Sequence, residues 1–144
     1  MTTLLPCYVL LDLETTGATP TQDRITEIGL IRYENGIEVG RWNTLINPEV
    51  SISPFIQRLT GITQGMVDHA PTFAQVCETL LQWLDQAVLC AHNVRFDYGF
   101  LKNEFKRIGV TFQKKLLCHY WAVSVDLYPA PPRHGRYRND GGIH

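Results

Sequence analysis

The stretch Tyr8-Val9-Leu10-Leu11-Asp12-Leu13-Glu14 decides the fold class, because a short apolar run turns here into an alternation of acidic and apolar residues. Aromatic, β-branched and aliphatic residues in such a run predict a buried strand. Side chains alternate between the two faces of a strand, so Asp12 and Glu14 are expected on one face and their leucine neighbours on the other. A pair of carboxylates therefore faces away from an otherwise apolar strand.

The segments that follow the first strand are typical of an antiparallel meander. Asn35-Gly36 separates two strand-like runs, residues 25–33 and 37–46, and this dipeptide is the strongest short-range signal of a hairpin. Asn47-Pro48 ends the third strand, and Ser53-Pro54-Phe55 opens a segment of short helical turns and loops.

Helical spacing then alternates with short apolar runs. A capping box formed by Thr72 and Gln75 begins a helix that we expect to reach about Ala87. Residues 88–91 predict a strand, and apolar residues spaced by three and four predict a helix from there to Gly109. A further short strand is expected near residues 116–117. The fold class predicted is α/β: a mixed sheet flanked by helices, in which later strands run parallel to the first.

Length and composition fit one domain. The chain has 144 residues, a net charge of −1 and 44% hydrophobic residues, enough for a core that needs neither a disulfide nor a metal to hold it together. We expect a domain over residues 1–128 and a disordered tail over 129–144, since the tail has almost no apolar side chain. Four distant cysteines, no secretory leader and no long apolar run predict a cytoplasmic protein without a membrane anchor.

Charge is distributed unevenly along the chain. Residues 1–94 hold four Lys or Arg against ten Asp or Glu, whereas residues 95–144 hold nine against four. A polyanionic partner of the second half is one interpretation, and two differently solvated faces are the other.

A third acid, Asp97, follows the predicted strand 88–91 and falls in the first turn of the next helix. The carboxyl ends of the first strand and of the strand 88–91 can lie side by side, at the place where α/β folds commonly build their sites. The three carboxylates of Asp12, Glu14 and Asp97 could then converge. Their mutual repulsion is about 4 kcal/mol per pair at 4 Å and an effective dielectric near 20. Hard divalent cations would relieve it, and two such ions about 3.5–4 Å apart can promote phosphodiester cleavage. The alternatives are an ordinary solvated strand face for the pair and a favourable helix-dipole position for Asp97.

Four segments carry a resemblance to a known family. Asp12-Leu13-Glu14-Thr15-Thr16-Gly17, Ile25-Thr26-Glu27-Ile28-Gly29, Leu59-Thr60-Gly61-Ile62 and Ala91-His92-Asn93-Val94-Arg95-Phe96-Asp97 resemble the DEDD-type 3′-to-5′ exonucleases, in family order and at family spacing. Within that family the chain is similar to the branch of the proofreading epsilon subunit of bacterial DNA polymerase III.

The resemblance implies a ribonuclease-H-like sheet and a metal-dependent exonuclease that releases nucleoside monophosphates from 3′ ends in DNA proofreading or repair. It also implies the partners: a single-stranded 3′ end of DNA, with RNA as a further substrate, and polymerase or repair subunits. It assigns the catalytic and metal-binding roles, for two Mg²⁺ or Mn²⁺ ions, to Asp12, Glu14 and Asp97. Contacts to the terminal nucleotide are assigned to Leu13, Thr15, Thr16, Leu59, Thr60, Asn93 and Phe96.

The chain departs from the family after Tyr128. The family's general base is a histidine followed five positions later by a fourth aspartate, on a last helix, whereas here His134 is followed five positions later by Asn139. We therefore expect a fold truncated at its C-terminus. Absence of a general base alone costs about 10²–10⁴-fold in rate.

Two other functions stay open on the sequence. The first is a catalytically silent, exonuclease-like domain that acts as a nucleic-acid or protein binding module. The second is a haloacid-dehalogenase-like phosphatase with Asp12 as nucleophile, which is disfavoured because that chemistry usually has Asp rather than Glu at position 14 and because the hairpin does not suit its sheet.

Overall fold

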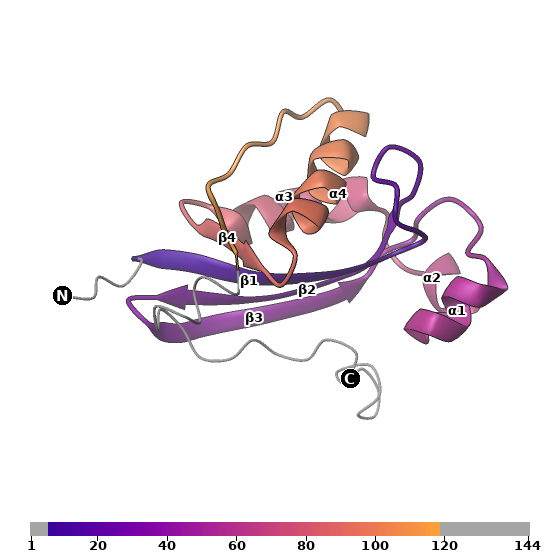
Figure 1. Cartoon of the computed structure of the whole chain (residues 1–144), viewed down its shortest axis with the longest axis horizontal. Helices are drawn as coiled ribbons and strands as arrows, with labels where there is room; N and C mark the ends of the chain where they lie inside the picture. The colour runs from indigo at the N-terminus through magenta and orange to yellow at the C-terminus, as the bar shows by residue number, and fades with distance from the viewer. Residues whose placement is uncertain (1–5, 119–144) are drawn as a thin grey trace.

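The structure, a computed structural model, describes residues 6–118 as a mixed sheet with helices (Figure 1). The predicted domain boundary at residue 128, the tail 129–144 and the His134 segment lie outside the described residues.

The described residues form five strands in the order β3-β2-β1-β4-β5. The first three pair antiparallel as a meander, while β4 and β5 run parallel to β1, so the predicted α/β sheet is confirmed. The elements are β1 (Cys7–Thr15), β2 (Ile25–Glu34), β3 (Ile37–Leu45), α1 (Pro54–Thr60), α2 (Gln64–Asp68), α3 (Phe73–Leu84), β4 (Val88–Ala91), α4 (Val94–Arg107) and β5 (Leu116–Cys118).

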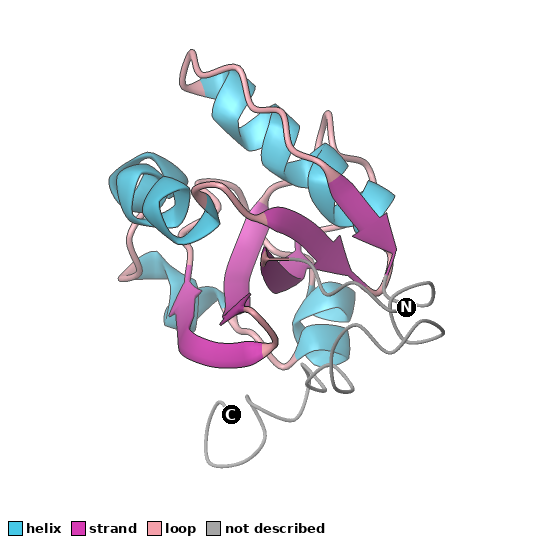
Figure 2. Cartoon of the chain, turned by 90° about the vertical axis from the view of Figure 1, so that its left-hand side faces the viewer, coloured by secondary structure: helices cyan, strands magenta, loops and turns pink. Residues whose placement is uncertain are grey.

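Helices α3 and α4 cover one face of the sheet and form the main core with it. Figure 1 shows both above the strands, and Figure 2, turned by 90°, shows the twist of the sheet beneath them. Val9, Leu11 and Leu13 of β1 point into this core, where they meet the fully buried Leu80 of α3 and Phe100 of α4. Burying each such side chain contributes about 1.5–3 kcal/mol, so this face fixes the two helices on the sheet.

The opposite face of the sheet has a different composition. Tyr8, Leu10, Ile31 and Tyr33 form a second apolar cluster on it, with the Tyr8 and Tyr33 rings stacked at 5.0 Å. Further along β1 the same face carries Asp12 and Glu14, because every second residue of a strand points the same way.

The ends of α3 and α4 follow local chemistry. A capping box at Thr72 begins α3, as predicted, but the helix ends at Leu84 rather than near Ala87, because Asp85 has a non-helical ψ of 126° and Gln86 follows with a left-handed φ of 57°. Helix α4 ends at Arg107, and Gly109 follows with a φ of 82°, the left-handed conformation typical of a glycine past a helix end.

The short helices α1 and α2 form a separate unit beyond the end of the sheet (Figure 1). Ile52, Ile62 and Val67 make its small core, against which Ile56 of α1 and Leu45 of β3 are packed. The mixed segment predicted after residue 53 is thus attached to the sheet through the last residue of β3.

Within residues 6–118, none of the helices combines the length and the apolar character that crossing a membrane requires.

Candidate active site

The carboxylates of Asp12 and Glu14 lie at the end of the central strand. Both residues are half-buried, on the face of β1 that turns away from α3 and α4. In the antiparallel register, Asp12 pairs with Gly29 and Glu14 pairs with Glu27 of β2. Position 29 is a glycine, and an added Cβ there would lie 3.1 Å from the side-chain amide nitrogen of Asn43 on β3, so the Asn43 side chain already occupies the space beside Gly29.

Glu27 is an acidic side chain that sequence reasoning placed in a motif but gave no role. It is only 3% exposed, and the register sets it directly opposite Glu14. Directly opposed side chains on an antiparallel pair are close neighbours. Glu27 therefore adds a fourth acidic side chain to the three predicted ones at this end of the sheet. The alternation of residues 25–29 is the signal that could have put Glu27 in phase with Glu14.

Asp97 joins this group from the first turn of α4. Its side chain is 7% exposed, and its carboxylate accepts a hydrogen bond from the backbone N–H of Leu13, the residue between Asp12 and Glu14. Burial first, and then the negative charge of Asp12, raise the pKa of Asp97 to about 8, with a smaller repulsion from Glu14. The three predicted acids are therefore electrostatic neighbours, and burial and repulsion outweigh the backbone N–H groups of Leu13 and Asp97, which lower the pKa of the Asp97 carboxyl.

The chemistry of these donors fits a hard divalent cation. Carboxylate oxygens are the ligands that Mg²⁺ and Mn²⁺ prefer, and the repulsion felt by Asp97 is what a cation between the carboxylates would relieve. In the part of the chain that the structure describes, no group of three or more His, Cys, Asp or Glu side chains is placed to hold a metal ion. The carboxylates are thus neighbours, with Asp97 held by the Leu13 N–H, rather than a preformed metal cage.

The loop that leaves β1 holds two of the predicted nucleotide contacts. The Thr15 hydroxyl donates to the carbonyl of Gly17 at 2.6 Å, next to a register shift between Glu14 and Thr15. The Thr16 hydroxyl donates to Asp23 at 3.1 Å and accepts the backbone N–H of Arg24 at 3.0 Å. Both threonines therefore shape the loop 16–24 beside the carboxylates.

Leu13 differs from the other predicted nucleotide contacts. Its side chain is buried in the main core, on the face opposite Asp12 and Glu14. What Leu13 presents to the candidate site is its backbone N–H, which binds the Asp97 carboxylate.

Leu59 and Thr60 lie on α1, apart from the carboxylates. Leu59 is 68% exposed, whereas the Thr60 hydroxyl donates to the Ile56 carbonyl within the helix. Phe55, one turn before Leu59, is 63% exposed and was missed by sequence reasoning, which treated it only as a helix start. Glu14 pairs with Glu27, and Glu27 pairs with Leu45, against which the unit of α1 and α2 packs. Two strand spacings, or about 10 Å, therefore separate Leu45 from Glu14.

The start of α4 supplies the last two predicted residues. Asn93 is exposed and makes no side-chain capping bond at the helix start. Phe96 is half-buried against the ring of Phe100, at 4.8 Å between centroids. Both flank the helix turn that carries Asp97, so the structure gathers Asn93, Phe96 and the three acids at one end of the sheet.

Sequence comparison identifies related proteins. The family model described as Exonuclease matches residues 9–140. The chain is 40% identical over 110 residues to a PolC-type DNA polymerase III of Caldanaerobacter subterraneus, covering 76% of this chain and 8% of that protein. It is 43% identical over 103 residues to the 3′-5′ exonuclease DinG of Bacillus subtilis, covering 71% and 11%. The chain thus spans less than a fifth of the length of the curated relatives it matches.

Structure comparison agrees at the level of the fold. Exonuclease I in its apo form superposes with a TM-score of 0.72 at 20% identity, over 81% of this chain and 30% of that one. Escherichia coli exonuclease I in complex with a dT13 oligonucleotide superposes with a TM-score of 0.70, over 79% and 28%.

Proposed function

Because the chain belongs to the exonuclease family, whose model matches residues 9–140, we propose that it is a metal-dependent 3′-to-5′ exonuclease. It hydrolyses the phosphodiester bond at a 3′ end and releases nucleoside monophosphates, in DNA proofreading or repair. The observation that carries this proposal is the parallel pairing of β1 with β4, which brings the buried Asp97, in the first turn of α4, close to Asp12 and Glu14 although it lies far along the chain.

Exonucleases of this kind are metal-dependent, and Asp12, Glu14 and Asp97 are the residues that would hold two Mg²⁺ or Mn²⁺ ions. Bound ions would supply the positive charge that activates water and stabilises the leaving oxygen. The protein contributes orientation: the Leu13 N–H fixes the Asp97 carboxylate, and the β1 backbone fixes the other two on one face.

The proposed substrate is the single-stranded 3′ end of DNA. The exposed Leu59 and the half-buried Phe96 offer apolar surface on which sugars and bases pack without sequence readout. Thr15, Thr16, Thr60 and Asn93 would complete the nucleotide pocket. The solved oligonucleotide complex of exonuclease I supports a DNA strand, and RNA is the further substrate that the sequence leaves open.

The relatives also support the proposed setting of the reaction. PolC-type polymerases and DinG carry their matching segments within much longer proteins, so polymerase or repair subunits are the partners we propose, in the cytoplasm.

The decisive experiment is a gel assay of the purified chain on a 5′-labelled single strand with Mg²⁺ or Mn²⁺. Stepwise shortening with release of monophosphates is expected, and Asp12→Ala should abolish it. Glu78→Gln, an exposed acid on α3, is the matched control and should leave the rate unchanged. Shortening that survives Asp12→Ala contradicts the proposal, and strand binding without hydrolysis favours the silent binding module.

A further inference from the structure

Helix α4 carries a second buried carboxyl group, which the reaction does not use. Glu104 lies seven residues after Asp97, on the same face of the helix and about 10 Å further along its axis. Its side chain is 1% exposed, so it needs partners for its charge.

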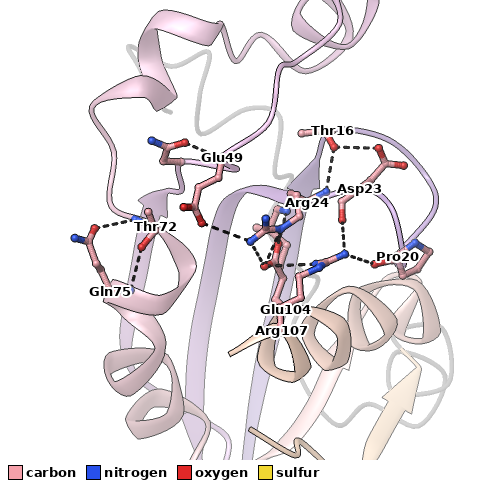
Figure 3. Close-up of polar contacts among 11 residues, drawn as sticks. Thr16, Pro20, Asp23, Arg24, Glu49, Thr72, Gln75, Glu104 and Arg107 are labelled. Carbon is pink, nitrogen blue, oxygen red and sulfur yellow. Dashed lines mark hydrogen bonds and ion pairs between the residues drawn. The ribbon is translucent and has the colours of Figure 1, made fainter. Parts of the chain in front are cut away.

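The start of β2 provides those partners (Figure 3). Nε of Arg24 donates to both Glu104 carboxylate oxygens at 3.1 Å, and Nη2 of Arg24 donates to Oε1 at 2.9 Å. The backbone N–H of Ile25 donates to Oε2 at 2.9 Å, and Arg107 lies 3.6 Å from Oε1. Glu104 therefore binds one guanidinium in a fork and one backbone group at a fixed point of the sheet.

The same network holds the loop 16–24 against α4. Arg107 donates to the carbonyls of Pro20 at 3.1 Å and Asp23 at 3.4 Å. At Gly99, between the two acids, an added Cβ would lie 3.5 Å from the Pro20 ring. The loop that begins with Thr16 and the helix that carries Asp97 are thus joined on one side (Figure 3).

We infer that Glu104 is a positioning residue that sets the place of α4 on the sheet and thereby presents Asp97 to Leu13, Asp12 and Glu14. Two attachments on one helix face, at Leu13 for Asp97 and at Ile25 for Glu104, fix both rotation and sliding of the helix. Phe100, Leu101 and Phe105 keep α4 packed on the sheet, so loss of one polar attachment allows a small shift of the helix and not its release. The catalytic part of this inference rests on the proposed function.

Two substitutions separate positioning from stability. Glu104→Gln keeps the side-chain length but loses the charge opposite Arg24, so it should lower thermal stability more than Glu104→Asp does. Glu104→Asp keeps the charge but is one methylene shorter, so α4 must shift or release Ile25. Glu104→Asp should therefore displace Asp97 more than Glu104→Gln does. The matched control is Glu38→Gln, which removes the charge from the exposed pair Glu38–Arg41.

The experiment uses the full chain and two readouts at a temperature where all variants are folded. Amide hydrogen exchange by NMR reports the Leu13 N–H bond to Asp97, and exonuclease kinetics report kcat and KM. Glu104→Asp should speed Leu13 exchange about tenfold and lower kcat about 10–100-fold with KM nearly unchanged, while Glu104→Gln changes both less. Glu38→Gln should leave both readouts at the wild-type level.

A merely structural role predicts a different result. Exchange and kcat would then follow the order of thermal stability, with Glu104→Gln worse than Glu104→Asp, and that order overturns the inference. Unchanged Leu13 exchange in folded Glu104→Asp overturns it as well. A chain that hydrolyses no strand refutes the proposed function, and the exchange measurement still decides the placement of Asp97.

Discussion

Asp97 and Glu104 are two acids of one helix face, buried to a similar depth, yet their surroundings are opposite. Glu104 is bound by Arg24, by the N–H of Ile25 and by the nearby Arg107. Asp97 has two backbone N–H groups, one of them its own, against the charges of Asp12 and Glu14. A buried carboxylate that has cationic and N–H partners stabilises the fold, whereas a buried carboxyl group beside like charges is typical of a functional site that favours a cation.

The largest effect should come from removing the compensated acid. Glu104→Ala leaves Arg24 and the Ile25 N–H without their acceptor, and we expect a loss of about 3–5 kcal/mol in the free energy of unfolding. Urea denaturation measures it. Glu38→Ala, at an exposed pair, should cost less than about 1 kcal/mol. Equal losses in the two variants would show that the Glu104 network is no stronger than a surface ion pair.

Removing the charge of Asp97, the acid beside like charges, should change the free energy of unfolding in the opposite direction. The pKa of Asp97 is about 8 in the folded chain and about 3.9 in an unfolded one, so between these values the folded state holds a proton that the unfolded state has released. Stability contributed by this proton is complete below about pH 4 and is lost as the pH rises through 8. Asp97→Asn keeps the shape of the side chain without its charge. At pH 8 its free energy of unfolding should exceed that of the wild type by about 2–4 kcal/mol.

Urea denaturation at several pH values, with a chelator present, tests this second prediction. The variant should show a flatter pH dependence than the wild type between pH 5 and 8. A variant that is less stable than the wild type at pH 8 would mean that the ionised Asp97 is satisfied in the fold.

Divalent cations should act on one acid and not on the other. At pH 8, Mg²⁺ or Mn²⁺ at about 100 times its dissociation constant should stabilise the wild type by about 2–3 kcal/mol. The same addition should do little to Asp97→Asn. Differential scanning calorimetry, with Ca²⁺ and no addition as references, measures the shift. Equal stabilisation of both chains would place the cation elsewhere.

The contrast between these acids also shows what sequence can reveal. Local pattern predicts the strands, the Asn35-Gly36 turn and the Thr72 capping box, because each depends on neighbouring residues. Asp97 was predicted from its place after the strand 88–91 and from the family motif that contains it, but its approach to Leu13 is a tertiary contact. Glu104 has no local signal, since a lone glutamate among helical residues usually faces water, and its partner Arg24 is 80 residues away.

The end of α3 and the place of Leu13 show the same limit of local pattern. The end of α3 was placed too late because nothing in Asp85-Gln86 announces the left-handed turn that stops the helix. The resemblance to the exonuclease family assigned a nucleotide contact to Leu13, which stays a prediction, and alternation along β1 places the Leu13 side chain in the main core. The alternation itself was visible in the sequence, whereas the role of the Leu13 backbone depends on where α4 docks.

The smallest predicted effect lies midway between the two acids, at Gly99. An added methyl group would meet the Pro20 ring at 3.5 Å, an ordinary van der Waals contact. Glycine inside a helix costs about 0.5–1 kcal/mol relative to alanine, so Gly99→Ala should raise the free energy of unfolding by about that amount. Because the substitution stiffens the helix between its two attachments, Leu13 exchange should stay at its wild-type rate. If Gly99→Ala instead lowers stability and speeds Leu13 exchange, the loop 16–24 presses on α4 more tightly than the contacts indicate, and the glycine is there to admit Pro20.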